Sequence, residues 1–205
     1  MRSRARALGQ VLALGAAAAL AACRLPRESP SPRFWVLTPV DASVSDAPVV
    51  RTVGVGPVDL PAYLDRAAVV TRAGPRLDVA TYDLWGQPLA ENVTAVLGRN
   101  LECMAPGTAV QLFPWNVPST DLDQRVTVQF TRFEADADGA VHLDASWELR
   151  SGATAKQLAS GRAAIREPVA GANVQETTAA MSRALGQLSR DIAAHLESGS
   201  GASGR

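Results

Sequence analysis

Few side chains in this chain are suited to nucleophilic, acid–base or metal chemistry near neutral pH, because its 205 residues include only two cysteines and two histidines. His142 falls on the polar side of a predicted strand, and His195 falls in the last turns of a predicted helix, where a cation suits the helix dipole. Neither histidine has another His or Cys at metal-ligand spacing. Cys103 falls on the apolar side of a predicted helix, where a lone cysteine is more often a small core residue than a nucleophile. We expect all three residues to be structural.

Carboxylates and glycines give no catalytic or ligand-binding pattern either. Glu134, Asp136 and Asp138 gather near a predicted hairpin tip, but the further ligands of a calcium loop are missing, so we expect them to be solvated. Gly54-x-Gly56 lacks the third glycine of a dinucleotide fingerprint, and nearby prolines disfavour the helix that such a loop needs. No serine-hydrolase elbow, phosphate loop or zinc pattern occurs. The sequence therefore predicts no enzyme, no metal site and no dissociable cofactor.

Cys23 differs from the other reactive residues in what precedes it. Arg2, Arg4 and Arg6 form a positive end, and residues 11–22 form a short apolar run. Because a membrane-spanning helix needs about 20 apolar residues, this run is too short to span comfortably. A positive end, a short apolar core and small residues before a cleavage point predict a secretory signal peptide over residues 1–22. Its last residues and Cys23, Leu-Ala-Ala-Cys, resemble the lipobox of bacterial lipoproteins.

That resemblance implies that Cys23 is the lipid attachment site. The cysteine would take a diacylglyceryl thioether, become the first residue of the mature chain and carry fatty acyl chains such as palmitate. Arg24 follows instead of the Asp that tends to retain lipoproteins in the inner membrane, so the resemblance implies the outer membrane, with the protein facing the periplasm. Residues 23–33 would form the acylated, Pro-rich tether, which reaches roughly 30 Å. The alternatives are an ordinary signal peptide that happens to contain Cys23, or a buried N-terminal helix.

Length and charge limit the function further. Removal of the first 22 residues leaves 183 residues, which suits one domain with a sizeable core. The formal net charge is zero, with 20 basic and 20 acidic residues, and the mature part has no basic cluster. A nucleic-acid partner is therefore not expected.

Strand patterns dominate both halves of the predicted domain. In 141–150 the alternation of apolar and polar residues is complete, and 125–133 alternates as well, so we expect an antiparallel hairpin with one solvated face. Residues 156–166 continue as a third strand. Shorter apolar runs predict strands at 34–37, 51–60, 67–71, 77–80 and 110–113.

Two amphipathic helices complete the expected fold. Leu89, Val93, Leu97 and Leu101 form one apolar stripe, and Asn173 caps a second, longer helix. The fold class is therefore α+β: a mixed or antiparallel sheet with two amphipathic helices packed on one face. Both halves run from strands to a helix, which suggests two similar units, although no letter-level repeat supports a duplication. We expect a single domain over residues 34–197 and a disordered Gly/Ser-rich tail over residues 198–205.

Aromatic residues supply the candidate partner-binding site. Trp115 follows Phe113 in a Pro-flanked loop, and exposed aromatic side chains are enriched at protein contacts. We therefore expect Trp115 and Phe113 to contact a partner. The alternative is that Trp115 folds back over the edge of the sheet.

Three further motifs resemble those of one known family, the PqiC-type ABC transport auxiliary lipoproteins, also called the membrane integrity-associated transporter subunit family. They follow the lipobox in the family's order and cover nearly all of the mature chain: Phe34-Trp35-Val36-Leu37, Val58-Asp59-Leu60-Pro61-Ala62-Tyr63-Leu64-Asp65-Arg66 and Tyr82-Asp83-Leu84-Trp85-Gly86-Gln87-Pro88-Leu89. The sequence departs from the family in having Phe34-Trp35 where two tyrosines are usual, and Gly86 where Ala or Glu is more common.

The resemblance implies a role in lipid transport. Such lipoproteins are non-catalytic, outer-membrane-side partners of MCE-domain systems that move lipids between the two membranes, while other chains supply the ATPase and permease. It also implies a compact α+β domain of two similar halves. Some members assemble into rings, so a homo-oligomer is a further expectation, although no residue pattern indicates one. The alternatives are a lipoprotein chaperone or assembly factor for an outer-membrane protein, and a small lipid-binding shuttle, which would need an apolar cavity of about 300 Å³ or more.

Overall fold

A computed structural model describes residues 30–40, 47–171 and 173–198 of the chain. The expected signal peptide, Cys23, most of the tether and residues 199–205 of the expected tail lie outside the described residues. Within the described part, eight strands and two long helices follow in this order: β1 Arg33–Trp35, β2 Arg51–Asp59, β3 Ala68–Ala73, β4 Arg76–Trp85, α2 Leu89–Met104, β5 Thr108–Leu112, β6 Gln124–Asp136, β7 Ala140–Ser151, β8 Gln157–Pro168 and α3 Val174–Ser198.

Strand β6 is the axis of a single mixed sheet. On one side, β7 pairs antiparallel with β6 along its whole length, and β8 pairs antiparallel with β7. On the other side β6 has two neighbours, because β2 pairs parallel with its first half and β3 pairs parallel with its last residues. Beyond them, β5 continues from β2, and β4 followed by β1 continues from β3. The sheet therefore forks at β6.

The predicted hairpin of β6 and β7 is confirmed, and its alternation sets the core face. Val126, Leu143 and Leu149 are fully buried, whereas Thr127 and Glu148 lie on the polar face. A bulge between Phe130 and Arg132 shifts the alternation in β6 by one residue. At the turn, Gly139 adopts a φ of 74°, which glycine reaches without steric cost. Because alternate residues of a strand point to opposite faces, the apolar residues of this hairpin determine which face of the sheet carries the core.

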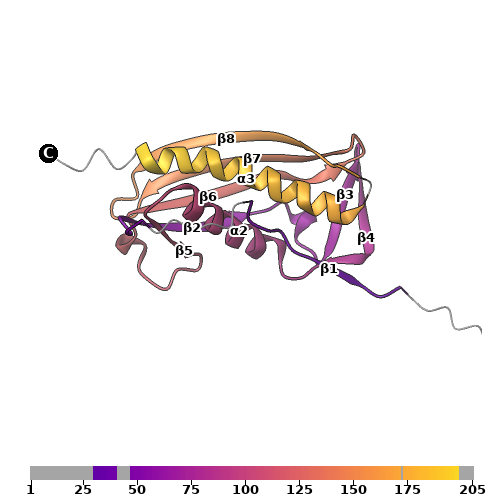
Figure 1. The fold of residues 1–205 in the computed structure, drawn as a ribbon, viewed down its shortest axis with the longest axis horizontal. Helices are drawn as coiled ribbons and strands as arrows, with labels where there is room; N and C mark the ends of the chain where they lie inside the picture. The colour runs from indigo at the N-terminus through magenta and orange to yellow at the C-terminus, as the bar shows by residue number, and fades with distance from the viewer. Residues whose placement is uncertain (1–29, 41–46, 172, 199–205) are drawn as a thin grey trace, which may run out of the picture. The chain divides into compact units, whose positions relative to one another are not determined.

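Both helices cover the same face of the sheet, as the sequence predicts (Figure 1). Helix α2 packs on β2 and β5, α3 packs on β7, β8 and β6, and the two helices contact each other. The Asn173 cap is confirmed, because its side-chain oxygen accepts a hydrogen bond from the Glu176 N–H at 2.9 Å. None of the described helices is both long and apolar enough to cross a bilayer.

The two halves share an element order but not a pairing pattern. Four strands precede α2, and four more lie between α2 and α3. However, β6, β7 and β8 form one continuous meander, whereas β2 pairs with β5 and β6 and only β3 and β4 form a hairpin. Strand β1 adds to β4 in parallel and begins at Arg33, the last residue of the expected tether.

The turn after β7 gives a first testable prediction. The Gly152 N–H donates to the Asp123 oxygen at 3.0 Å, and a Cβ on Gly152 would overlap the backbone oxygen of Leu122. Because backbone atoms cannot rotate away, we expect Gly152→Ala to lower the free energy of unfolding by about 2–3 kcal/mol. Urea unfolding followed by tryptophan fluorescence measures the change.

Gly171→Ala is the matched control, since its new Cβ would lie at an ordinary 3.5 Å from the Glu176 Cγ. Equal stability of the two variants would contradict the packing described for Gly152.

Candidate functional site

The loop after β5 brings Trp115 onto the sheet face opposite the helices and leaves Phe113 at the edge of the sheet beside α2. A Cβ on Gly98 of α2 would lie 2.5 Å from the Leu112 side chain, so Leu112 and its register partner Val55 face α2. Gly54, one residue earlier, therefore faces the other way. A Cβ on Gly54 would lie 2.9 Å from the Trp115 ring. Trp115 thus folds back over β2, which was the alternative expectation for this residue.

Phe113 stays at the surface beside it. Its side chain is 47% exposed, and its ring meets the Trp115 ring edge to face at 5.3 Å between centroids. The Phe113 N–H donates to the Val55 oxygen at 2.9 Å, and a Cβ on Gly56 would lie 2.6 Å from the Phe113 Cβ. The Gly54-x-Gly56 pair, which does not fit a nucleotide loop, therefore makes room for these two aromatic rings.

Arg125 of β6 completes this group and was not singled out from the sequence. It is the register partner of Gly54, and its guanidinium carbon lies 6.0 Å from the Trp115 ring centroid. Arg125 Nε and Trp115 Nε1 are buried and have no hydrogen-bond partner among the described residues. Within the same residues no carboxylate pairs with Arg125. Arg125 thus carries a charge without a described counter-ion next to the exposed Phe113, and both residue types are enriched at protein contacts.

A groove adjoins Phe113 between β2, β5 and the first turns of α2. Its volume is about 440 Å³, and prolines and aliphatic side chains make up most of its wall. Glu91 is the one charged side chain in that wall, which consists of Pro57, Val58, Ala90, Glu91, Thr94, Leu112, Phe113 and Pro114. The exposed Phe113 and Leu112 side chains thus stand at the rim of an apolar depression.

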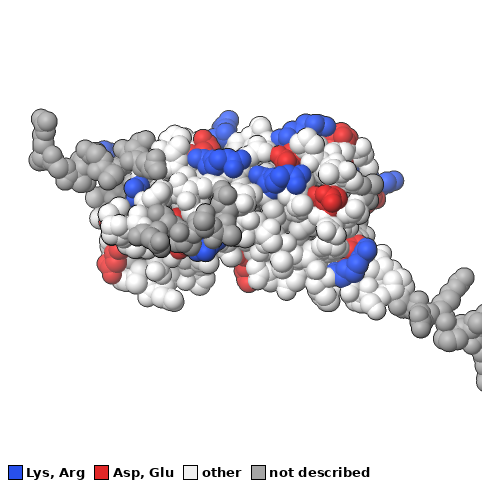
Figure 2. Space-filling view, viewed as in Figure 1, with Lys and Arg blue, Asp and Glu red and all other residues white. Residues whose placement is uncertain are grey.

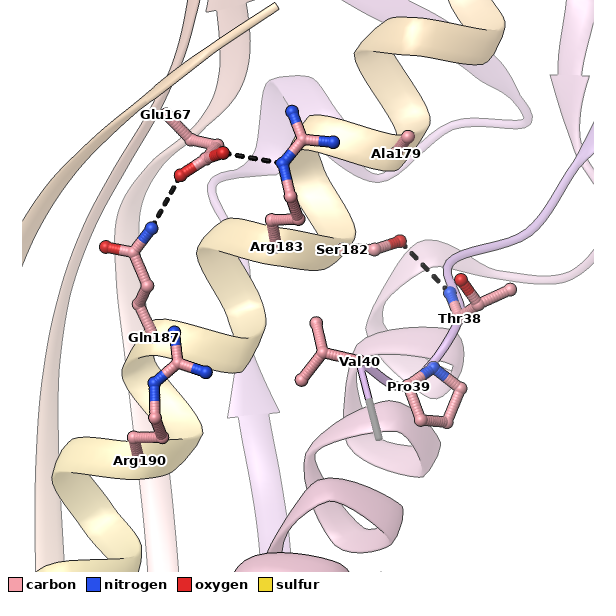
Figure 3. A pocket seen from close by; sticks show the side chains of 9 residues that line it. All are labelled: Thr38, Pro39, Val40, Glu167, Ala179, Ser182, Arg183, Gln187 and Arg190. Carbon is pink, nitrogen blue, oxygen red and sulfur yellow. Dashed lines mark hydrogen bonds and ion pairs between the residues drawn. The ribbon is translucent and has the colours of Figure 1, made fainter. Parts of the chain in front are cut away.

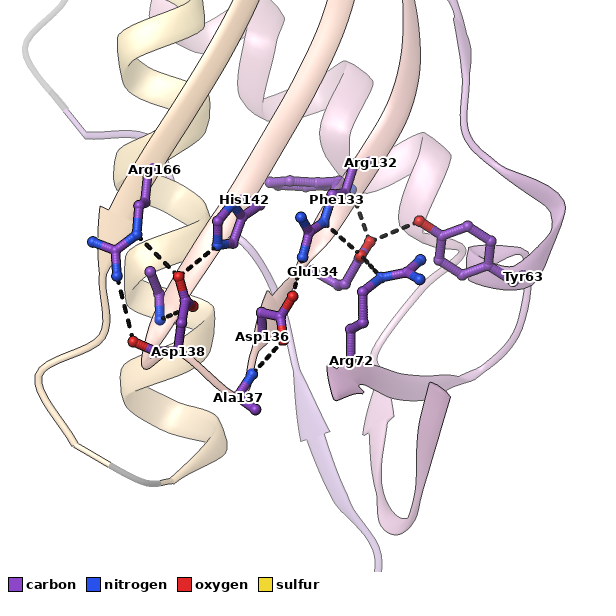
Figure 4. Close-up of polar contacts among 11 residues, drawn as sticks. Tyr63, Arg72, Arg132, Phe133, Glu134, Asp136, Ala137, Asp138, His142 and Arg166 are labelled. Atoms are coloured by element: carbon purple, nitrogen blue, oxygen red, sulfur yellow. Dashed lines mark hydrogen bonds and ion pairs between the residues drawn. The ribbon is translucent and has the colours of Figure 1, made fainter. Parts of the chain in front are cut away.

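A second cluster surrounds Glu134, and here the expectation of a solvated carboxylate is wrong. Glu134 is fully buried, and Figure 4 shows its carboxylate between the side chains of Tyr63, Arg72 and Arg132. Arg72 Nε donates to one carboxylate oxygen at 2.6 Å and Arg132 Nε to the same oxygen at 3.0 Å, while the Tyr63 hydroxyl donates to the other at 2.8 Å. Tyr63 and Arg72 come from segments far away in the sequence, so they cover a side chain that the hairpin alone would leave in water.

The pKa values follow from this geometry. Burial alone would raise the pKa of Glu134, yet hydrogen bonds from Arg72, Tyr63, Arg132 and the Phe133 N–H together hold it below the usual range. Burial and the hydrogen bond to Glu134 raise the pKa of Tyr63. Glu134 is therefore ionised at neutral pH. The cluster joins the Tyr63 turn, which is the short 3-10 helix Ala62–Leu64, to β3 and β6 by charge-assisted hydrogen bonds.

The other titratable groups lie in surface or structural contacts. His142 Nε2 and Arg166 Nε each lie 3.0 Å from Asp138, and these contacts, His142 first, lower the pKa of the Asp138 carboxyl. His195 Nδ1 lies 2.9 Å from the Asp191 oxygen, and its ring contacts Trp147. Across residues 30–40, 47–171 and 173–198, no group of three or more His, Cys, Asp or Glu side chains could hold a metal ion.

The segment after β1 runs between the two helices and is held by side-chain hydrogen bonds. The Leu37 N–H donates to Asn92 at 2.6 Å and the Val40 N–H to Asn100 at 3.1 Å, both on α2. On α3, Ser182 accepts from the Thr38 N–H at 3.1 Å (Figure 3). These bonds satisfy backbone groups of an irregular segment that lies against the core.

An open pocket of about 600 Å³ lies beside this segment. Figure 3 shows Arg183 and Gln187 of α3 turned toward Glu167, to which both donate at 2.6 Å. Charged and hydroxyl groups contribute much of the wall, which consists of Thr38, Pro39, Val40, Glu167, Ala179, Ser182, Arg183, Gln187 and Arg190. This pocket is not the apolar cavity that a lipid shuttle would need.

The two longer motifs meet at another depression. Its volume is about 280 Å³, and it is lined by Asp65, Arg66, Ala67, Trp85, Gln87, Pro88 and Leu89. The Trp85 N–H donates to the Ala67 oxygen at 2.6 Å, which fixes the two motifs against each other.

Comparison with known proteins identifies the group to which this arrangement is similar. A family model described as "ABC-type transport auxiliary lipoprotein component" matches residues 35–193. Comparison with curated proteins finds no significant match.

Two crystal structures share the fold. The first, described as an uncharacterized protein, has a TM-score of 0.68 and 21% identity, with 82% of this chain and 99% of the other covered. The second, from Xanthomonas campestris with the family label DUF330, has a TM-score of 0.60 and 20% identity, with coverages of 83% and 98%.

Proposed function

The chain belongs to the family of ABC-type transport auxiliary lipoprotein components, and from this premise we propose that it serves an MCE-type system that moves lipids between the inner and outer membranes. In this role the protein is a non-catalytic subunit that needs no cofactor, while other chains bind ATP and form the conduit. The single observation that carries the proposal is the family match, which spans residues 35–193 and thus nearly the whole described domain.

Cys23 is the proposed anchor. The lipobox-like Leu-Ala-Ala-Cys sequence supports acylation of its thiol, with palmitate among the attached acyl chains, and Arg24 at the next position supports the outer membrane. The domain would then face the periplasm at the end of a short tether. This location suits a subunit that links a transport conduit to the membrane that receives or donates the lipid.

The surface formed by Phe113, Trp115 and Arg125, which we name the docking face, is the proposed contact with the MCE-domain protein. Phe113 offers exposed apolar area beside a groove, and Arg125 offers a charge that no described carboxylate neutralises. A partner that places an apolar side chain in the groove and a carboxylate near Arg125 would complement both features.

Affinity purification of the tagged lipoprotein from its native cells tests the function. We expect an MCE-domain protein to be recovered with it, together with the permease and ATPase of the same system. Recovery of only the lipopolysaccharide-export or β-barrel assembly machinery would instead favour the chaperone role and contradict the proposal. Recovery of bound lipid without any of these proteins would favour the shuttle.

The docking face gives a sharper prediction. Phe113→Ser combined with Arg125→Glu removes an aromatic anchor and reverses a charge, so we expect the Kd for the MCE-domain protein to rise about tenfold or more. Titration of the purified proteins, for example by microscale thermophoresis, measures the change.

Leu158→Ser on β8 is the matched control, because Leu158 is 45% exposed and Phe113 is 47% exposed. If the double variant, the control and the unaltered protein had similar Kd values, the docking face would not be the contact with the MCE-domain protein.

A further inference from the structure

An exposed apolar strip lies on β1 and β4. Phe34 is 66% exposed, Val36 50% and Tyr82 40%. The register pairs Phe34 with Leu84, and side chains two residues apart share a face, so Phe34, Val36, Tyr82 and Leu84 lie on one side of the two strands. In Figure 2 the surface at the lower right, where β1 lies in Figure 1, shows an uncharged area beside a basic and an acidic side chain.

This strip is held firmly by the opposite side of the same strands. Arg33 and the Trp35 indole nitrogen both donate to the buried Asp83 at 2.9 Å. The bond from Arg33, with a smaller one from Trp35, lowers the pKa of the Asp83 carboxyl. The Gly86 N–H also donates to the Trp35 oxygen at 2.8 Å, and a Cβ on Gly86 would lie 3.1 Å from Val36. Phe34 and Val36 are therefore presented outward from an anchored strand.

The covalent chain places this strip near the expected acyl group. From Cys23 to Phe34 the chain spans at most about 40 Å even when fully extended, at roughly 3.6 Å per residue. Whatever conformation these residues adopt, the strip cannot lie farther than that from the anchored cysteine. Among the exposed large apolar side chains that the structure describes, Phe34 is the first along the chain after Cys23.

We propose that Phe34, Val36 and Tyr82 rest in the interfacial region of the bilayer that holds the acyl chains, and so set the orientation of the domain on the membrane. This inference rests on the proposed acylation of Cys23. Phe supplies a rigid apolar surface, and Tyr combines an apolar ring with a hydroxyl that can face the headgroups, as at other membrane interfaces.

The tether makes such a small strip sufficient. Three side chains would bind a membrane only weakly on their own. Once the acyl chains are inserted, however, contact of the strip becomes an intramolecular event with a high effective concentration. The strip then selects one orientation, while the acyl chains supply the retention.

Fluorescence of the mature, acylated protein in vesicles tests this inference. In a Cys103→Ser background, Phe34→Cys carries a thiol-reactive, environment-sensitive fluorophore, and Leu158→Cys carries it as the control. The vesicles contain phosphatidylethanolamine, phosphatidylglycerol and a lipid with a nitroxide near the top of one acyl chain. We expect a blue-shifted emission and quenching several-fold stronger for the label at position 34. A label on Tyr82→Cys should lose its quenching when Phe34→Asp is added, with thermal unfolding used to confirm that each variant is folded.

The outcomes separate this inference from the anchor on which it rests. Flotation with the vesicles and mass spectrometry of the N-terminal peptide report acylation independently of the label. A protein that floats but is quenched equally at positions 34 and 158 would overturn the inference and leave the anchor intact. The same holds if the strip is shielded from water but not quenched by lipid, because a second copy or another protein would then cover it. A protein that is not acylated and does not float would overturn both proposals.

Discussion

Replacing Glu134 with alanine is expected to lower the free energy of unfolding by about 3 kcal/mol, because it leaves two arginines without their common partner. Arg72 and Arg132 both bond to the buried Glu134 carboxylate, and Tyr63 also donates to it. The loss is placed at the lower end of the range for buried pairs, since both arginine side chains are partly exposed and solvent can screen their charge. Urea unfolding of the mature protein measures it.

The stabilisation by Glu134 is expected to depend on pH. The pKa of Glu134 is lowered in the folded protein, so the ionised carboxylate stabilises the fold above the pKa that it has in the unfolded chain. That contribution is lost as the pH falls through the lowered value. The difference between the unaltered protein and Glu134→Ala should therefore be full at neutral pH and should shrink in the acid range below the usual glutamate pKa.

Asp138→Ala is the control for charge removal at the same hairpin, because Asp138 is solvent-exposed and we expect little change in stability there. If Glu134→Ala proved as stable as this control, the cluster would not hold the Tyr63 turn and β3 to β6.

Replacing Cys23 with serine is expected to abolish outer-membrane association. A serine hydroxyl cannot form the thioether, so neither acylation nor the cleavage that follows it should occur. A single acyl chain binds membranes only marginally, with an association constant of about 10⁴ M⁻¹, so a protein without acyl chains keeps no comparable anchor. We expect labelling with radioactive palmitate to disappear, and cells that carry only the variant to be as sensitive to membrane-damaging agents as a deletion strain.

The unprocessed variant retains its apolar N-terminal run, so the assay must separate the inner and outer membranes and not simply collect total membrane. Cys103→Ser should be labelled and sorted like the unaltered protein, which controls for loss of a thiol as such. If Cys23→Ser were labelled with palmitate as strongly as the unaltered protein, Cys23 would not be the lipid attachment site.

Elements whose patterns are local could be predicted from the sequence. Helix α2 and the β6–β7 hairpin follow from their own periodicity, and the Asn173 cap follows from a single residue type before an amphipathic run. Their placement on one face also follows, because the alternation in 141–150 leaves only one apolar face of the sheet for the apolar stripes of the helices to cover. The family resemblance is likewise confirmed, since the family model covers residues 35–193.

The fork of the sheet at β6 could not be predicted. Which strand lies beside which depends on contacts between residues far apart in the sequence, such as Thr71 with Ala135 and Val53 with Gln124. Alternation assigns a face to each residue but does not name its neighbour. Glu134 illustrates the consequence. Strict alternation from Val126 would place it on the core face, but a bulge between Phe130 and Arg132 turns it to the other face, and its burial there depends on Tyr63 and Arg72 from distant segments.

The candidate docking face was found in part. Phe113 and Trp115 could be singled out because prolines flank an unusual pair of aromatic residues. The fold of Trp115 onto β2 had a signal in Gly54, since a residue without Cβ often marks close approach of another group. Arg125 had no signal of its own: its lack of a partner becomes visible only when every described carboxylate has been placed.

The segment from Leu37 to Val40 has a mechanical consequence. A pull on the membrane tether enters the domain through β1, an edge strand that is held by β4 and by the bonds of Arg33 and Trp35 to Asp83. Once β1 separates from β4, the load passes to the side-chain bonds with Asn92, Asn100 and Ser182, which lie on both helices. Unravelling beyond this one short strand therefore requires the contacts to both helices to open.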